Sequence, residues 1–284
     1  LRNRLSNIAD QSPDHLPIEV TWMENQIASA LADVELSGLV TSEEAENPSL
    51  DLIALLRRKA KEFDSLRDET LRDFASQRAG VEIASIAAET EDILYGHPPV
   101  ADEMLNLEAT TAKPTMQKAR RHLVAKKRAA LIADLLHARL VLIQQRQALT
   151  NPEMVVRILE IEEVKVAINT VLAALKSRFA GINMLEISTC GAIPPYNHIL
   201  GGKLASLLLF SPQIAADYRR IYGGPSIIAS QMKNEPVCRP NELVYLGTTS
   251  LYFQGSSQYE RLRLPAETIA PDQPELRFTK IGQT

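Results

Sequence analysis

The chain has 284 residues, 45% of them apolar, which is enough for two domains with buried cores. It holds two cysteines and no apolar run of about 18 residues, which excludes a disulfide-built secreted fold and a membrane-spanning helix. We therefore expect a cytoplasmic protein without membrane contact. The chain starts at Leu1 without a methionine, and we expect it to be a piece of a longer protein.

The net charge of −4 hides an asymmetry along the chain. Residues 1–112 carry 22 acidic and 9 basic side chains, a net charge of −13, whereas residues 113–284 carry 13 acidic and 22 basic ones, a net charge of +9. Two interpretations are open. Either the acidic half docks on the basic half, or the basic half faces a negatively charged partner such as nucleic acid.

Helical periodicity dominates the first 181 residues. Val20, Met23, Ile27, Leu31 and Val34 recur at spacings of three and four, which predicts one apolar helix face. A second long helix is expected after Pro48, a third over residues 81–95, and a fourth from Pro114 to Thr150. Asn151 is a good N-cap for a further helix that ends at Gly181, so the last two helices predict an antiparallel hairpin.

The pattern changes from Ile182 onward. A short strand at residues 182–188 is followed by helices at 204–210, 212–222 and 226–233, and then by strands in ELVYLGTTSLYF, SQYERLRLP and ELRFTKIG. Helices precede strands instead of alternating with them, which predicts an α+β fold with an antiparallel or mixed sheet. We expect three regions: an acidic helical region at 1–112, a basic helical hairpin at 113–181 and an α+β domain at 182–284.

A basic run lies on the helix that starts at Pro114. From Lys113 to Gln147 there are nine lysines or arginines and one acid, Asp134, so more than one helix face must be positive. Such a stripe is sufficient for phosphate contacts. The alternative is a helix paired with acids of the first half. The candidate nucleic-acid contacts are Arg120, Arg121, Lys126, Lys127 and Arg128.

The loop at 188–203, STCGAIPPYNHILGGK, mixes a thiol, an imidazole, an amide and a lysine in a way that no packing rule requires. Cys190 could act as a nucleophile with His198 as its base and Asn197 orienting the imidazole. The alternative is a small buried cysteine and a capping or core histidine. The histidines and cysteines show no paired spacing, so we expect no metal site, and no cofactor is indicated.

Gly201, Gly202 and Lys203 lie at a predicted helix start, where free N–H groups favour an anion. The full GxxxxGK[ST] motif is absent, and a tight turn is the alternative. Ser256, Ser257 and Tyr259 lie in a second polar stretch, residues 247–259. We expect the two loops to meet in one anion-binding site.

The segments CGAIPPYNHILGGKLASLL, YRRIYGG, IIASQM, PVCRP and TTSLYFQGSSQYERLRLP resemble the C-terminal region of DruA-like proteins of the Druantia anti-phage defence system. The resemblance covers about residues 185–284. It implies a defence role beside a large helicase-like partner and supplies no catalytic residues.

Two functions therefore stay open. The first is a defence subunit that associates with nucleic acid, with the helicase-like partner, or with both. The second is an enzyme that acts on a nucleotide-like or other anionic substrate through the loops 188–203 and 247–259. The residues do not name a reaction.

Overall fold

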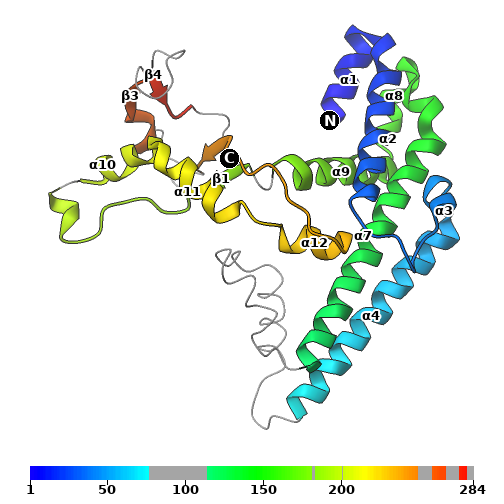
Figure 1. The fold of residues 1–284 in the computed structure, drawn as a ribbon. Coiled ribbons are helices and arrows are strands. Elements are labelled where there is room, and N and C mark those ends of the chain that lie inside the picture. The colour runs from blue at the N-terminus through cyan, green and yellow to red at the C-terminus, as the bar shows by residue number, and fades with distance from the viewer. Residues whose placement is uncertain (77–113, 181–182, 200, 249–257, 267–274, 280–284) are drawn as a thin grey trace. The chain divides into compact units, whose positions relative to one another are not determined.

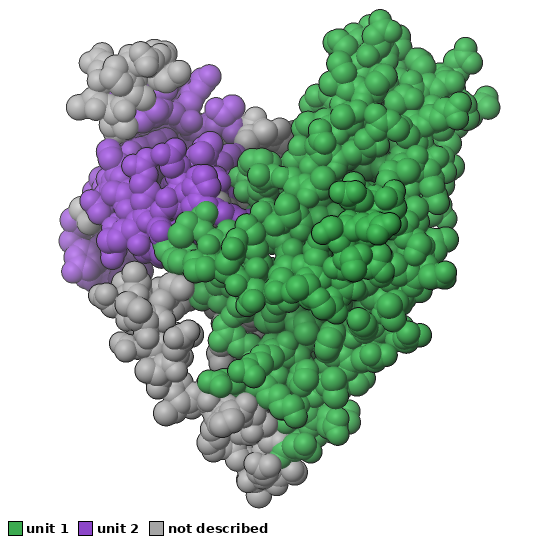
Figure 2. All heavy atoms as spheres, turned by 45° about the vertical axis from the view of Figure 1, so that its right-hand side comes forward, with its two compact units in different colours: residues 1–179, 224–238 green, residues 180–223, 239–284 purple. Residues whose placement is uncertain are grey.

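The computed structural model describes residues 1–76, 114–180, 183–199, 201–248, 258–266 and 275–279 (Figure 1). These residues form two compact units, which Figure 2 shows in different colours. Unit 1 comprises residues 1–179 and 224–238, and unit 2 comprises residues 180–223 and 239–284. The expected boundary at residue 112 and the expected helix at 81–95 lie outside the described residues.

Unit 1 is helical. Its helices are α1 (Arg2–Gln11), α2 (Leu16–Ala32), α3 (Ser42–Glu46), α4 (Leu50–Ser76), α7 (Pro114–Leu149), α8 (Pro152–Ile158), α9 (Glu162–Leu175) and α12 (Ile227–Lys233), with a 3₁₀ turn at Pro13–His15 and a π turn at Lys176–Ala180. α7 packs against α4, α2, α8 and α9, so it is the central helix of the unit (Figure 1). The predicted helix from Pro114 is confirmed.

The core of unit 1 forms where the apolar helix faces meet. The predicted stripe of α2, from Val20 to Val34, is buried along its whole length, which confirms the periodicity argument. Leu123, Leu135 and Leu142 of α7 are also buried. Leu131 of the same helix, although apolar, is 38% exposed.

Helix α4 is an antiparallel neighbour of α7. Ion pairs join Lys126 to Asp64 and Arg57 to Asp134, so α4 runs antiparallel to the first half of α7. The side chain of Asn151 caps α8 by accepting from the Glu153 N–H at 2.9 Å, as predicted. However, the helix expected from Asn151 to Gly181 is interrupted between α8 and α9. Two acids at the start of α9 stabilise a new helix N-terminus there, because they complement its dipole.

Unit 2 combines short strands with short helices. Its elements are β1 (Met184–Glu186), a 3₁₀ turn (Tyr196–His198), α10 (Gly201–Leu207), a 3₁₀ turn (Leu208–Phe210), α11 (Pro212–Tyr222), β2 (Tyr245–Gly247), a 3₁₀ turn (Gln258–Arg261), β3 (Arg263–Pro265) and β4 (Glu275–Arg277). The α+β class is confirmed. Among the described residues the strands form two separate pairs instead of one sheet, with β1 parallel to β2 and β3 antiparallel to β4.

Local side-chain contacts fix several elements of the C-terminal part. Asn183 donates to the carbonyls of Pro240 and Glu242 at 3.2 and 2.8 Å, which holds β2 beside β1. Ser226 caps α12, and Asn234 ends it in the left-handed conformation at φ 59°. Within SQYERLRLP, residues Gln258–Arg261 form a 3₁₀ turn and not the expected strand. The turn places Tyr259 and Leu262, three residues apart, in one buried cluster.

Candidate functional site

Arg128 of the basic run makes its polar contacts within unit 1. Its Nη1 donates to Oε2 of Glu35 at 2.9 Å, and its Nη2 donates to the carbonyl of Gln231 at 3.4 Å. The side chain is only 18% exposed. Because Gln231 lies in α12, this arginine links three segments of unit 1 that are distant in sequence.

Arg120 and Lys126 also have partners in unit 1. When the Gln231 amide oxygen is oriented toward α7, it accepts from Nε of Arg120 at 3.1 Å. Burial lowers the pKa of Arg120. Lys126 pairs with Asp64 of α4 at 2.8 Å.

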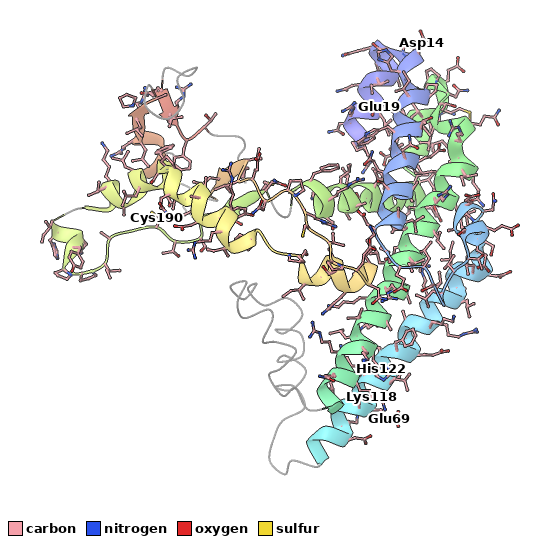
Figure 3. All side chains as sticks on the ribbon, viewed as in Figure 1. Asp14, Glu19, Glu69, Lys118, His122 and Cys190 are labelled. Atoms are coloured by element: carbon pink, nitrogen blue, oxygen red, sulfur yellow. The ribbon has the colours of Figure 1, made fainter. Side chains whose placement is uncertain are left out.

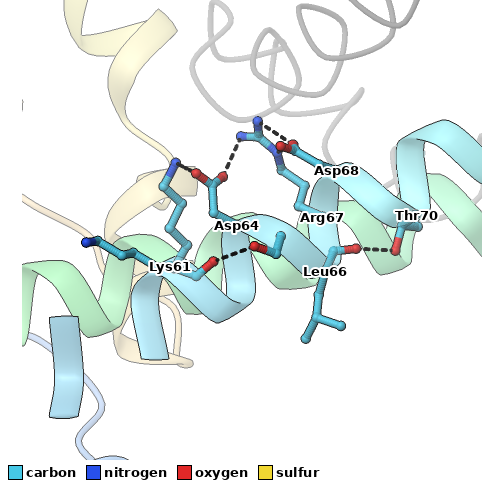
Figure 4. A network of polar contacts seen from close by, with 8 residues as sticks. Lys61, Asp64, Leu66, Arg67, Asp68 and Thr70 are labelled. Atoms are coloured by element: carbon cyan, nitrogen blue, oxygen red, sulfur yellow. Dashed lines mark hydrogen bonds and ion pairs between the residues drawn. The ribbon is translucent and has the colours of Figure 1, made fainter. Parts of the chain in front are cut away.

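Asp64 belongs to a polar network along α4 (Figure 4). Its carboxylate lies 3.7 Å from Arg67, which in turn contacts Asp68 at 3.1 Å. One turn later the Thr70 hydroxyl donates to the Leu66 carbonyl at 2.7 Å. The carboxylate that pairs with Lys126 therefore comes from the acidic first part of the chain.

These contacts favour docking of the acidic segment on the basic one as the role of Lys126 and Arg128, whereas Arg120 contacts α12. Lys127 is half-buried, whereas Arg121 is exposed, as is Lys118 one turn earlier. Phosphate contact by α7 stays a prediction, and its best candidates are now the two exposed cations.

His122 lies on α7 close to Lys118 (Figure 3). Its Nε2 is buried and has no hydrogen-bond partner among the described residues. Burial, followed by the positive charge of Lys118, lowers the pKa of this histidine below its ordinary value of 6.5. The folded protein therefore holds His122 in its neutral form more strongly than the unfolded chain does.

We expect the stability of unit 1 to fall as the pH drops below about 6.5, because the unfolded chain then binds a proton that the folded state disfavours. The loss should be complete once the pH is below the folded pKa of His122. Thermal unfolding at pH 7.5 and at lower pH values measures it, and His122→Gln should shrink the pH dependence. Lys118→Gln should shrink it partly, since it removes the second cause of the shift. Equal pH dependence in all three proteins would contradict this account.

A shallow pocket of about 400 Å³ lies on the surface of unit 1 beside α4 and α7. Its lining residues are Leu50, Ile53, Ala54, Arg57, Arg58, Lys61 and His137. The cations could receive an anion, but Arg57 already lies 3.7 Å from Asp134, and Arg58 lies 3.7 Å from Glu62. Sequence analysis did not find this pocket, because its lining combines two helices that are far apart in the chain.

Cys190 of unit 2, which Figure 3 labels, lies beside an apolar cluster. It packs, half-buried, against a cluster that contains Ile187, Tyr259 and Leu262. Its Sγ lies 3.7 Å from Oγ of Ser206, a fully buried serine that donates to the Gly202 carbonyl at 2.9 Å. This packing favours a structural role for the thiol. Ser206 was not singled out from sequence, since a serine inside a helix gives no local signal.

The other predicted residues of unit 2 are only partly brought together. Asn197 and His198 lie in the exposed 3₁₀ turn that precedes α10, and Lys203 is exposed on α10. α10 begins at Gly201, close to the predicted helix start. The ring of Tyr259 stacks at 5.2 Å on Phe278 inside the cluster, so the end of the second loop contacts the same cluster as Cys190.

Several expectations are not tested by these contacts. Ser256 and Ser257 lie outside the described residues, so convergence of the two loops on one anion site stays a prediction. Within the described ranges, no group of three or more His, Cys, Asp or Glu side chains could hold a metal ion. No helix in the part of the chain that the structure describes is long and apolar enough to cross a membrane.

Comparison with known proteins shows which family the C-terminal part of the chain resembles. Residues 180–284 match the family model described as Druantia protein DruA. This region is DruA-like. The Druantia protein DruA of Escherichia coli (strain UMEA 4076-1) is 37% identical over 83 residues, which are 29% of this chain and 19% of that relative. The match therefore spans about a fifth of the relative's length, and no solved structure matches the chain.

The DruA-like region is not confined to one compact unit. Residues 180–223 and 239–284 form unit 2, whereas residues 224–238, with α12, belong to unit 1. Arg128, outside the matched region, thus binds Gln231 inside it. The match confirms the resemblance drawn from the motifs and moves its start to residue 180.

Proposed function

We propose that this chain serves in a Druantia-type anti-phage defence system as a subunit that associates with nucleic acid and with a helicase-like protein of the system. The family match over residues 180–284 is the observation that carries this proposal. Because the match covers 19% of the curated relative, the proposal concerns the role of the region present here.

Exposed apolar side chains of unit 2 support a protein partner. Ile193, Tyr196 and Ile199 are 70%, 55% and 77% exposed in one loop, and Leu204 and Leu208 are exposed just after it. Large apolar side chains that gather on a surface often mark an interaction site. Their position within the DruA-like region makes that region the proposed docking element.

The surroundings of Cys190 support binding in preference to catalysis. A nucleophilic thiol needs a site where its thiolate is stabilised and accessible. Cys190 instead packs against apolar side chains and a buried serine hydroxyl. We therefore rank association with partners above an enzyme that uses this thiol.

Binding of the purified chain to fluorescently labelled duplex DNA of arbitrary sequence tests the proposal. We expect affinity to fall linearly with rising salt on a log–log plot, with little dependence on sequence. Lys118→Gln with Arg121→Gln should make the slope shallower by about 0.9 for each phosphate that the protein no longer neutralises. An unchanged slope would show that Lys118 and Arg121 of α7 do not contact DNA. Absence of DNA binding at low salt would contradict the nucleic-acid part of the proposal.

A further inference from the structure

The pair formed by β3 and β4 has two chemically different faces. Leu264 pairs with Leu276 in the register of the strands, and the neighbouring Leu262 and Phe278 belong to the apolar cluster of unit 2. Side chains alternate between the faces of a strand. Residues 263 and 277 therefore share the opposite face, and the structure shows both exposed.

Arginines occupy both positions. Arg263 and Arg277 are directly opposite each other in the antiparallel register. Like charges in that position repel, so the pairing weakens a two-stranded element that is already short. One carboxylate on this face, Glu275, lies 3.4 Å from Arg263. Among the described residues of this face, the two arginines thus outnumber the acid.

We propose that this arginine face, formed by Arg263 and Arg277, binds the phosphate backbone of duplex DNA. Two observations favour that ligand. The cations lie on a two-stranded antiparallel ribbon, an element narrow enough to enter the major groove. Guanidinium groups also match phosphate oxygens in a bidentate geometry.

The inference rests on the proposed association with nucleic acid and assigns a surface to it. That surface differs from the basic run of α7, where Arg120, Lys126 and Arg128 contact other parts of unit 1. It also differs from the predicted anion site at Gly201, Gly202 and Lys203.

Salt-dependent binding of labelled duplex DNA to the full chain tests the arginine face. Arg263→Gln with Arg277→Gln should weaken binding and make the log–log slope shallower by about 1.8, or 0.9 for each phosphate. Arg263→Lys with Arg277→Lys keeps both charges and should retain most of the slope. Relief of the cross-strand repulsion predicts that the glutamine variant unfolds at a temperature no lower than the wild type does, which separates weaker DNA binding from defective folding.

The matched control is Arg219→Gln with Arg220→Gln on α11. It removes the same charge from two exposed arginines of unit 2, which lie 3.8 Å from Glu242 and 3.3 Å from Asp217. We expect this control to bind DNA nearly as the wild type does. Equal weakening of DNA binding in both glutamine variants, or unchanged DNA binding in the Arg263 and Arg277 variant, would contradict the arginine face as the DNA-binding surface. Neither result would contradict the association with nucleic acid itself. A wild-type chain that fails to bind DNA would overturn the proposed association as well.

Discussion

Replacing Arg128 with alanine is expected to lower the free energy of unfolding of unit 1 by about 2 kcal/mol, the typical size for a hydrogen-bonded charged group. The guanidinium contacts Glu35 at 2.9 Å and the Gln231 carbonyl at 3.4 Å, and it is only 18% exposed. Alanine would remove both interactions and leave the Glu35 carboxylate, itself 27% exposed, without this partner. Thermal or denaturant unfolding measures the change.

Arg57→Ala is the matched control for this prediction. Arg57 also pairs with an acid of a neighbouring helix, but its distance to Asp134 is 3.7 Å and both side chains are more than half exposed. Such surface pairs contribute about 0 to 1 kcal/mol. If Arg128→Ala destabilised the protein no more than Arg57→Ala does, Arg128 would not be a structural contact.

A double-mutant cycle can assign the effect to its partner. Combining Arg128→Ala with Glu35→Gln should cost less than the sum of the two single changes, because each single change already breaks the same ion pair. Additive effects would show that Arg128 acts mainly through Gln231 and α12. Either outcome separates the two interactions that the guanidinium makes.

Much of the helical architecture could be predicted because its signals are local. The buried stripe of α2 follows from side-chain spacing, and α8 and α12 begin at the capping residues Asn151 and Ser226. The interruption between α8 and α9 was missed, since no proline or glycine marks it. The strands were placed near their positions but expected to be longer, and their separation into two pairs has no local sequence signal.

The role of the basic run could not be predicted, because its partners are remote in sequence. Arg128 lies 93 residues from Glu35 and 103 residues from Gln231. Composition alone leaves solvent exposure and internal pairing as equal alternatives. Only the packing of α4 and α12 against α7 distinguishes them for Arg120, Lys126 and Arg128.

The arginine face, in contrast, did have a sequence signal. Arg263 stands between Leu262 and Leu264 in the RLRLP segment, and Arg277 stands between Leu276 and Phe278 in ELRF. Alternation of this kind predicts one charged and one apolar strand face. What the sequence lacked was the register, which sets Arg263 opposite Arg277.

The central claim is that this chain contributes to defence by contacting nucleic acid. Its most direct test is the efficiency of phage plating on cells that carry the complete defence locus. Arg263→Gln with Arg277→Gln should raise phage plating to the level of cells without the locus, because the subunit would no longer hold the phosphate backbone of DNA. Arg219→Gln with Arg220→Gln, made at the same protein level, should leave protection intact. Full protection in the first variant, or equal loss of protection in both, would contradict the account.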